Sequence, residues 1–278
     1  MAGIAVVIEL NEALHSAPYG HPENSVRLHA IASRMEEEIA SGLLIRLSTR
    51  NHGIEPICRV HDQNYITGLR EICRRGNGYL DADTYVTAGS FDAACSIVNA
   101  VLSGVDAVSI GETRQVFILG RPPGHHAERE HAMGFCLINN VAVGAQYALD
   151  SGCASRVAVV DFDVHHGNGT QHLFYDRSDV LYISLHRYPF YPGTGSDLET
   201  GEGDGKGHTI NIPLAAGDGD DIIIARFEEA VIPAIDAFRP DLMFVSAGFD
   251  AYCLDPLGGL CVTGAGYLRL GELLRDSA

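Results

Sequence analysis

Positive charge is scarce in this sequence. Its 278 residues include 19 lysines and arginines against 36 aspartates and glutamates, which gives a formal net charge of −17. Binding of nucleic acid through its phosphates depends on clustered basic residues, so this composition argues against a nucleic-acid partner. An acidic protein attracts cationic substrates instead, such as lysine-rich tails or polyamines, although acidity can equally serve solubility alone.

Signals for disulfides, secretion and membranes are also missing. The seven cysteines are odd in number and contain no Cys-x-x-Cys pair. No signal peptide and no apolar stretch of membrane length is recognisable. We therefore expect no membrane partner and a reduced, cytoplasmic location.

The chain has no internal repeat, linker or low-complexity segment, and 46% of its residues are hydrophobic. We expect residues 1–278 to form a single domain around one substantial core. Apolar runs alternate with segments of helical periodicity, which predicts an α/β fold with a mostly parallel sheet and helices on both faces. The expected strands are residues 3–10, 116–119, 157–160, 180–185, 208–212 and 242–246, and the expected helices begin near residues 25, 90, 139, 218 and 263, the fourth of them kinked near Pro233.

The most informative stretch follows the predicted strand at residues 157–160. Asp161, Asp163 and His165 come directly after this apolar run, and they share one side of the chain if the extended geometry persists. Buried carboxylates without a partner are very costly, so a cation is expected beside them. Carboxylate and imidazole donors suit a zinc-like ion. The alternative is a hydrogen-bonded Asp-His loop without a metal.

Two other predicted strands also end in polar groups. His125 and His126 follow residues 116–119, and Asp250 follows residues 242–246. The carboxyl ends of parallel strands meet at one rim of the sheet, where α/β proteins place their active sites. A catalytic zinc takes three protein ligands and leaves one position open, and we interpret Asp163, His165 and Asp250 as those ligands. The adjacent histidines are then candidates for proton transfer, with Asp161 and Asn168 as candidates for fixing their tautomers.

Taken together, the motifs resemble the histone deacetylase superfamily, which also contains the acetoin-utilisation proteins and acetylpolyamine amidohydrolases. The matching segments are Arg121-Pro-Pro-Gly-His-His126, Gly134-Phe-Cys136, residues 161–171, Tyr191-Pro-Gly-Thr-Gly195, residues 246–251 and Asp255-Pro-Leu-Gly-Gly259, the last of which, with Asn168, resembles the class II branch. The resemblance implies a three-layer arginase-deacetylase-like fold. It also implies zinc-dependent hydrolysis of an N-acyl amine, either an acylated lysine peptide or an acylated polyamine.

The resemblance implies a role for each matching residue. It places zinc on Asp163, His165 and Asp250, makes His126 the general base and acid, and makes His125, held by Asp161, its electrostatic partner. The residues that match substrate-contacting positions are Gly134 with the aromatic walls Phe135 and Tyr191, the rim carboxylate Asp83, and Arg27 near an acetate exit route. The alternatives are ordinary core aromatics, a turn-capping aspartate and a solvated arginine.

Members of the superfamily also bind potassium. The resemblance implies a first site on Asp161, the main-chain carbonyls of Asp163 and His165, Ser184 and the carbonyl of Leu185, and a second site on the carbonyls of Phe174, Arg177 and Val180.

The sequence departs from the family pattern at its end. Members carry a further strand that ends in Gly-Gly-Tyr, whose hydroxyl stabilises the oxyanion, and neither Tyr252 nor Tyr267 matches it. Losing one oxyanion donor costs about 10²–10³ in rate, so we expect weak hydrolysis of amides and better hydrolysis of esters. Without that strand and its helix a sheet edge is exposed, and we expect a second subunit or a rearranged tail to cover it, which favours a homo-oligomer.

Two other functions stay open at this point. One is a catalytically impaired protein that binds acyl-lysine or acylated polyamines without turning them over. The other is a two-manganese ureohydrolase of related topology, which needs further metal carboxylates where this sequence has a His-Gly-Asn run.

Overall fold

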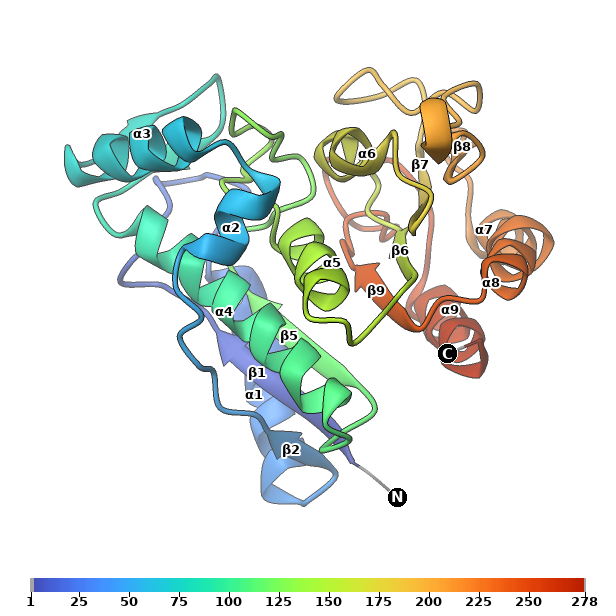
Figure 1. Cartoon of the computed structure of the whole chain (residues 1–278), viewed down its shortest axis with the longest axis horizontal. Coiled ribbons are helices and arrows are strands. Elements are labelled where there is room, and N and C mark those ends of the chain that lie inside the picture. The colour runs from blue at the N-terminus through green and yellow to red at the C-terminus, as the bar shows by residue number, and fades with distance from the viewer. Residues whose placement is uncertain (1–2, 278) are drawn as a thin grey trace. The chain divides into compact units, whose positions relative to one another are not determined.

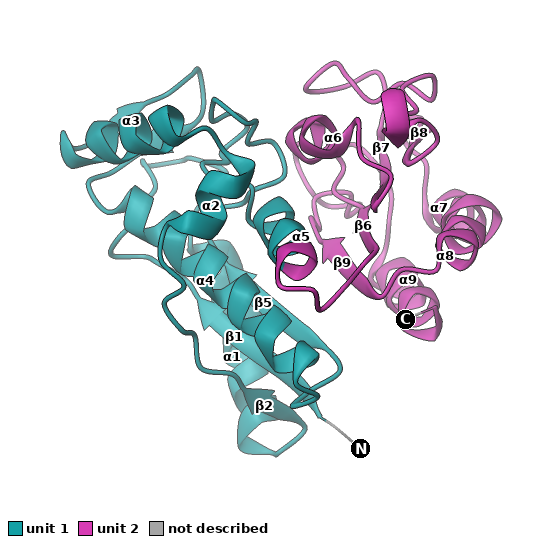
Figure 2. Cartoon of the chain, in the orientation of Figure 1, with its two compact units in different colours: residues 1–147 teal, residues 148–278 magenta. Residues whose placement is uncertain are grey.

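The computed structural model describes residues 3–277 and divides into two compact units (Figures 1 and 2). Unit 1 runs to Tyr147 and unit 2 begins at Ala148, so the helix α5 (Asn140–Asp150) crosses the boundary. The remaining elements of unit 1 are β1 (Ile4–Glu9), α1 (Val26–Ala40), β2 (Leu44–Arg46), α2 (Glu55–Val60), α3 (Gln63–Arg74), β3 (Gly78–Tyr79), β4 (Tyr85–Val86), α4 (Ser90–Ser109) and β5 (Val116–Gly120).

Unit 1 is built on a parallel sheet in the order β2-β1-β5, and β3 and β4 form a separate antiparallel pair. The long helix α4, which begins at the predicted position, buries Phe91, Val98 and Leu102. Gly120 allows this helix to approach the sheet closely, because a Cβ there would lie 2.3 Å from Cδ1 of Ile97. Strand β5 therefore ends against α4, directly before the segment that carries His125 and His126.

The helix α4 differs from one expectation. By length and composition alone it could cross a membrane, which the sequence analysis did not anticipate. However, 61% of its most apolar window is buried inside the structure, as is usual for the core helix of a globular unit. We therefore treat α4 as a packing element of unit 1.

Unit 2 is built on a second parallel sheet, in the order β8-β7-β6-β9. Its elements are β6 (Val157–Asp161), α6 (Asn168–Phe174), β7 (Val180–Arg187), η1 (Gly203–Gly205), β8 (Thr209–Leu214), α7 (Asp220–Arg226), η2 (Phe227–Val231), α8 (Ile232–Phe238), β9 (Leu242–Ser246) and α9 (Gly264–Asp276). The parallel pairing confirms the predicted fold class. Both sheets are parallel because strands alternate with helices along the chain.

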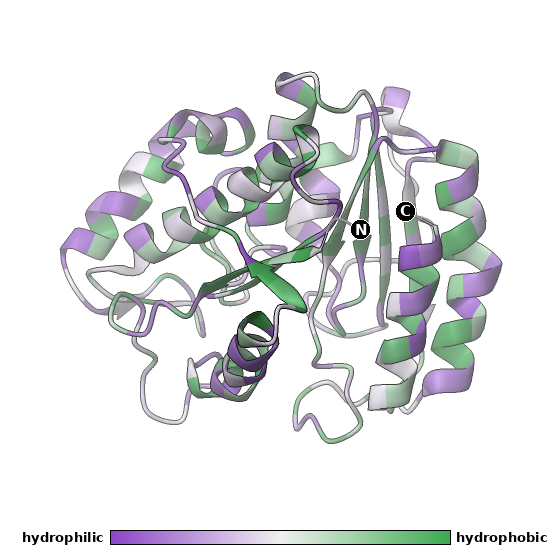
Figure 3. Cartoon of the chain, turned by 90° about the horizontal axis from the view of Figure 1, so that it is seen from below, coloured by the Kyte–Doolittle hydropathy of each residue, from purple (hydrophilic) through white to green (hydrophobic). Residues whose placement is uncertain are grey.

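The two faces of the second sheet differ in chemistry. Alternate residues such as Val160 and Ile183 pack into one core cluster with Phe227, Ile235 and Leu270 from the helices. Figure 3 shows the matching pattern, with mainly hydrophobic strands and helices that change between hydrophobic and hydrophilic stretches. The apolar face is thus covered by η2, α8 and α9.

The opposite face carries a row of polar side chains. Asp161 on β6 pairs in register with Ser184 on β7 and with Ser246 on β9, and Ser184 pairs with Asn211 on β8. Residues in register point to the same face of a parallel sheet, so these four side chains form one row across all four strands. The row lies toward the carboxyl ends of the strands.

The helix predicted to begin near residue 218 and to kink near Pro233 is present, and α7, the π-helical turn η2 and α8 follow one another from Asp220 to Phe238. The regular helix is interrupted because Pro233 lacks an N–H and would clash with a regular preceding turn. The break therefore lies just before the proline. Strand β5 is only partly buried: Leu119 is buried, whereas Phe117 is exposed at the edge of its sheet.

Candidate metal centre

The end of β6 directs three polar side chains away from the apolar core. Phe162 and Val164 belong to the core cluster, so Asp161, Asp163 and His165, which alternate with them, lie on the other side of the chain. The alternation of the strand thus continues past its last residue. This places a carboxylate and an imidazole two residues apart at the open end of the sheet.

Asp250 reaches the same place from the loop after β9. One of its carboxylate oxygens accepts a hydrogen bond from the backbone N–H of Val164 at 3.0 Å, and the other lies 3.0 Å from Nδ1 of His165. Gly248 permits this approach, since a Cβ at that position would lie 1.9 Å from a carboxylate oxygen of Asp163. Any other residue at position 248 would push the two loops apart.

Asp163, His165 and Asp250 form a compact set of metal-ligating atoms. One ligand atom from each lies within 4.8 Å of the other two. Nδ1 of His165 is 3.0 Å from Oδ1 of Asp163, which also accepts a hydrogen bond from the backbone N–H of His165 at 2.8 Å. All three side chains keep between 16% and 20% of their surface exposed, so an ion can reach them. Two carboxylate oxygens and one imidazole nitrogen form a donor set that suits zinc.

The charges in this cluster are not balanced. Burial lowers the pKa of His165, but its hydrogen bonds to Asp163 and Asp250 outweigh burial and raise the pKa to about 10. Burial raises the pKa of Asp250, and the neighbouring charge of Asp163 raises it further. Each group thus shifts toward holding a proton, as expected where two carboxylates lie close together.

The two adjacent histidines lie in unit 1, after β5. His125 and His126 are both buried, and their ring centroids are 3.9 Å apart with the planes tilted by 44°. Gly124 before them packs tightly, because a Cβ there would lie 2.7 Å from Oδ1 of Asn140. Because the two rings lie this close, the charge of either imidazole acts directly on the other.

A buried ion pair anchors the strand end just before the histidines, and sequence reasoning missed it. Nη2 of Arg121 donates hydrogen bonds to Oε2 of Glu23 at 2.8 Å and to the hydroxyl of Tyr85 at 2.7 Å. The same guanidinium donates to the carbonyl of His15 at 3.2 Å. Burial raises the pKa of Glu23, but hydrogen bonds to His15 and Arg121 lower it to about 2. No local pattern pairs residues 23 and 121, so only the fold reveals this contact.

Several of the predicted substrate residues gather in unit 1 around His21. Its Nε2 lies 2.9 Å from the carbonyl of Asp83, and its ring meets that of Phe135 edge-on at 5.0 Å. Phe135 has a positive φ of 68°, and its N–H donates to Oγ1 of Thr84 at 3.0 Å. Gly134 also has a positive φ, of 54°. A phenylalanine held in the left-handed region is costly, so the surrounding contacts must fix it.

Tyr191 lies in unit 2, beside the imidazole of His165. The rings of Tyr191 and His165 are 5.9 Å apart and nearly perpendicular, and Phe190 stacks on His165 at 5.3 Å and 13°. Residues 188–195, which carry Tyr191, form neither helix nor strand. Tyr191 keeps 38% of its surface exposed, so a molecule from solution can reach its ring.

A hydrogen-bond network fixes the loop that carries Tyr191. Glu199 accepts hydrogen bonds from the backbone N–H of Gly195 at 3.0 Å and from Nε2 of Gln171 at 2.6 Å. Gln171 also bonds to Nε2 of His166 at 2.9 Å, and Nε2 of His186 bonds to the carbonyl of Gly195 at 2.9 Å. The sequence analysis did not single out Glu199 or His186. Gly195 has no room for a side chain, because a Cβ would lie 2.3 Å from His186.

Five of the eight residues predicted to hold potassium are buried in unit 2, and the other three, Asp163, His165 and Arg177, are partly exposed. Asp161 and Ser184 are fully buried and face each other in the polar row described above. Phe174 and Val180 are buried at the two ends of the turn between α6 and β7, and the N–H of Arg177 donates to the carbonyl of Phe174 at 3.1 Å. The candidates for the second site are thus close in sequence at one turn.

Four other residues of interest lie elsewhere. Arg27 is exposed in the first turn of α1, and Arg121 is the arginine that unit 1 buries. Asn168 is buried at the start of α6. Tyr252 is exposed, whereas the ring of Tyr267 packs against Phe249 at 5.1 Å as part of the core.

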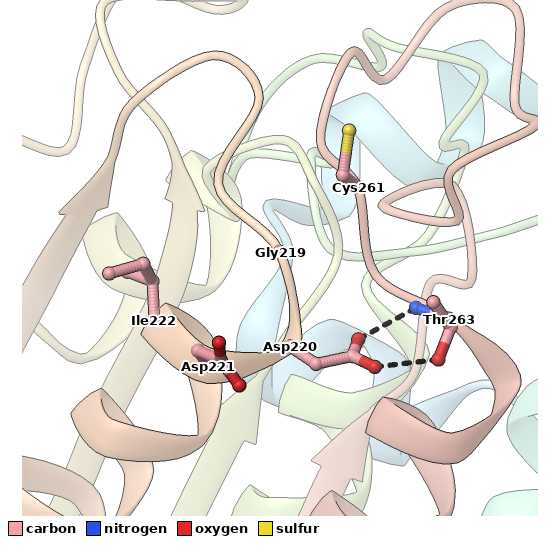
Figure 4. Close-up of a pocket in the computed structure, with 6 residues that line it drawn as sticks. All are labelled: Gly219, Asp220, Asp221, Ile222, Cys261 and Thr263. Carbon is pink, nitrogen blue, oxygen red and sulfur yellow. Dashed lines mark hydrogen bonds between the residues drawn. The ribbon is translucent and has the colours of Figure 1, made fainter.

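A shallow pocket opens in another part of unit 2 (Figure 4). None of the predicted site residues lines it. Asp220 at its edge accepts hydrogen bonds from the N–H of Thr263 at 2.8 Å and from its hydroxyl at 2.6 Å, which ties α7 to the start of α9. The carboxylate of Asp220 therefore has a structural role.

Comparisons with known proteins agree with this picture. A sequence model of the family described as histone deacetylase domain matches residues 21–278. An uncharacterized protein of Synechocystis sp. is 42% identical over 257 residues, which cover 91% of this chain and 83% of that protein. Other relatives are longer: the chain spans 62% of a rice histone deacetylase and 47% of an Arabidopsis one.

Two solved structures share the fold. The HDA15 HD domain is 39% identical with a TM-score of 0.94, covering 100% of this chain and 81% of that one. An acetylpolyamine aminohydrolase from Burkholderia pseudomallei is 31% identical with a TM-score of 0.86, covering 98% of this chain and 89% of that one. The arginase-deacetylase-like fold expected from the sequence is thereby confirmed.

Proposed function

The chain belongs to the histone deacetylase domain family, and we propose that it is a zinc-dependent hydrolase that removes acetyl or other short acyl groups from lysine side chains or related N-acyl amines. The observation that carries this proposal is the set of donor atoms from Asp163, His165 and Asp250, which lie within 4.8 Å of one another. Three such ligands leave a coordination position for the substrate.

Zinc at this position would bring the pKa of a coordinated water toward about 7 and polarise the carbonyl of the acyl group. We assign the proton transfer to His126, whose neutral ring nitrogen accepts a proton from the attacking water and returns it to the leaving amine. We assign His125 as its electrostatic partner, because the two ring centroids are only 3.9 Å apart. The charge on one imidazole therefore changes the proton affinity of the other.

The substrate is proposed to bind through its acyl-bearing chain and its backbone. Phe135 with Gly134 and Tyr191 are assigned to the aromatic walls that hold the chain, and Asp83 to the rim. The positive φ of Phe135 supports its assignment, because backbone strain of this kind is typical of binding sites. Arg27, which is exposed in the first turn of α1, is assigned to the exit of the released acid.

Two classes of substrate fit, acylated lysine in a peptide and acylated polyamine. The net charge of −17 favours a substrate that carries additional positive charge. One relative of known structure is an acetylpolyamine aminohydrolase, which acts in the same chemical class. A direct comparison of acetyl-lysine peptide with acetylated polyamine as substrates separates the two.

Potassium is proposed as a second cation. The carboxylate of Asp161, buried in register with Ser184, supports a first site that also includes carbonyls of Asp163, His165 and Leu185. The turn with Phe174, Arg177 and Val180 is assigned to the second site. Asp161 and Asn168 keep their proposed roles as hydrogen-bond acceptors for catalytic imidazoles.

The central experiment combines metal analysis with turnover of an acylated fluorogenic lysine. We expect one bound zinc per chain, and we expect His126→Ala to keep the zinc but lose at least about 10²-fold in rate, the usual contribution of a positioned acid-base group. Zinc binding without turnover in the unaltered protein would favour the alternative, a protein that binds acylated amines without hydrolysing them.

The preference for esters is a second part of the proposal. Among the described residues after Asp250 the tyrosines are Tyr252, which is exposed, and Tyr267, which packs in the core. We therefore expect the 278-residue chain to hydrolyse a short-chain aryl ester much faster than an acetyl-lysine anilide. Comparable rates for the two substrates would contradict this.

Three further expectations stay predictions. They are a single domain over residues 1–278, a homo-oligomer that covers the edge strand β9, and a reduced cytoplasmic compartment. Seven free cysteines, three of them exposed, support the last. Light scattering tests whether the chain forms a homo-oligomer. A single cooperative unfolding transition is expected if residues 1–278 form a single domain.

A further inference from the structure

Arg187 is the last residue of β7, and its side chain contacts Phe190, which stacks on His165, and the loop that carries Asp250. The sequence analysis assigned it no role. Its guanidinium carbon lies 4.1 Å from the centroid of the Phe190 ring, and its Nη1 donates a hydrogen bond to the carbonyl of Gly258 at 3.2 Å. Its backbone N–H donates to the carbonyl of Val164 at 2.9 Å, which fixes the start of the side chain.

The first contact leads to His165. The ring of Phe190 stacks on the imidazole of His165 with centroids 5.3 Å apart and planes only 13° from parallel. Phe190 thus makes parallel contact with His165 and a close cation–π contact with Arg187. A cation over an aromatic face stabilises this arrangement and limits rotation of the ring. Because His165 stacks on the ring of Phe190, the orientation of its imidazole is restricted as well.

The second contact leads to Asp250. Gly258 lies so close to the backbone of Asp250 that a Cβ at position 258 would be 1.8 Å from the Asp250 carbonyl oxygen. At Gly259 a Cβ would be 2.6 Å from Nη1 of Arg187. The loop of two glycines is therefore packed between the guanidinium and the backbone of Asp250. A hydrogen bond from Arg187 to Gly258 fixes the distance between them.

We propose that Arg187 is a positioning residue of the metal centre, which holds His165 through Phe190 and Asp250 through the Gly258–Gly259 loop. This inference rests on the proposed function, because it assumes that Asp163, His165 and Asp250 bind zinc. Groups behind the ligands of a metal orient those ligands, and replacing such a group typically lowers metal affinity by about 10–100-fold.

The two contacts together require arginine. A planar guanidinium can stack on a ring with its face and donate a hydrogen bond from its edge at the same time. The ammonium of lysine is a point charge without a plane, so it can keep the charge but not both contacts. Arg187→Lys is therefore expected to behave like Arg187→Met, and the comparison separates geometry from charge.

The test measures zinc affinity by competition with a chromophoric chelator, and it records the visible absorption spectrum of the cobalt-substituted protein. The spectrum reports the geometry of the ligands without relying on turnover. For Arg187→Met and Arg187→Lys we expect zinc affinity to fall about 10–100-fold and the cobalt bands to weaken and shift. Unchanged affinity and an unchanged spectrum in both variants would overturn the proposal.

A matched control exists in the same unit. The guanidinium of Arg156 lies 5.8 Å from the ring centroid of Phe238 and makes the same type of contact away from the ligand loops. Arg156→Met should leave zinc affinity and the cobalt spectrum as in the unaltered protein. An equal loss in Arg156→Met would show a general effect of removing a guanidinium, and it would also overturn the proposal.

A double-mutant cycle with Phe190→Leu tests the route to His165. Because Arg187 acts on His165 through Phe190, the two substitutions should lower zinc affinity by less together than the sum of their separate effects. Strictly additive effects of the two substitutions on zinc affinity would show that Arg187 does not act on His165 through Phe190. If Arg187→Met does not fold, Arg187→Lys and Phe190→Leu carry the same test. Zinc binding that fails in the unaltered protein contradicts the proposed function, whereas an Arg187 variant with normal binding contradicts only this inference.

Discussion

The charged side chains that the two units enclose differ in their composition. In unit 1 the carboxylate of Glu23 meets the guanidinium of Arg121, and both side chains are at most 4% exposed. In unit 2 the carboxylates of Asp163 and Asp250 share a single imidazole, that of His165. A balanced pair holds a fold together, whereas an unbalanced set attracts a cation.

The pKa values express the same difference. Burial raises the pKa of Glu23, yet its partners lower it to about 2, so the carboxylate stays charged at every ordinary pH. In unit 2 the pKa of Asp250 is raised, and that of His165 is raised to about 10 despite burial. The pKa of Glu23 is thus lowered and that of Asp250 is raised. This difference distinguishes the structural ion pair of unit 1 from the candidate metal site of unit 2.

The largest expected effect comes from removing a carboxylate of the unbalanced set. Asp163→Ala should lower the hydrolysis rate by roughly 10³-fold or more, because a catalytic metal contributes several kcal/mol to the barrier. A discontinuous assay with acetyl-lysine peptide measures this. Asp220→Asn is the matched control, since Asp220 is hydrogen-bonded only to Thr263 in the pocket of Figure 4, and it should keep the normal rate.

The next effect concerns the balanced pair. Glu23→Gln leaves Arg121 without its counterion, so the free energy of unfolding should fall by about 3–5 kcal/mol, by the same amount with and without zinc. Urea denaturation measures it. Glu37→Gln removes an exposed pair with Arg34 and should cost less than about 1 kcal/mol. Equal losses for the two variants would contradict the role of the buried pair.

A smaller effect is the pH dependence of zinc binding. His165 of the metal-free protein is protonated below pH 10, so zinc must displace that proton. Zinc affinity should therefore rise about tenfold per pH unit between about pH 7 and 9. Titration calorimetry in two buffers should show about one proton released per zinc bound. An affinity that is independent of pH in this range would contradict the raised pKa.

The same proton affects the stability of the metal-free protein. The pKa of His165 is raised from its ordinary value, so protonation stabilises the folded state. This contribution is complete below about pH 6.5, the ordinary pKa of histidine, and is lost as the pH rises toward 10.

Much of the metal centre could be predicted from the sequence because it depends on local order. Asp163 and His165 follow a buried strand at a spacing of two, and Asp250 follows another strand of a parallel sheet, so topology alone brings them to one end. Strand alternation is a short-range property of the backbone, and it survives in the structure.

The remaining contacts depend on packing between segments far apart in the sequence. Glu23 and Arg121 are 98 positions apart, and Arg187 meets Gly258 across 71 positions. Periodicity carries no information about such pairs. The π-helical turn before Pro233 is a similar case, because the proline predicts a break but not which residues absorb it.

Thermal unfolding of Asp250→Asn and of the unaltered protein, each with a chelator and with zinc, tests the central claim most directly. The account predicts that zinc at about a hundred times its Kd stabilises the unaltered protein by about 2.7 kcal/mol and the variant hardly at all. It also predicts that without metal the variant is at least as stable as the unaltered protein, because one of two neighbouring like charges is gone. An unaltered protein that zinc does not stabilise, or a metal-free variant that is clearly less stable, would contradict the account.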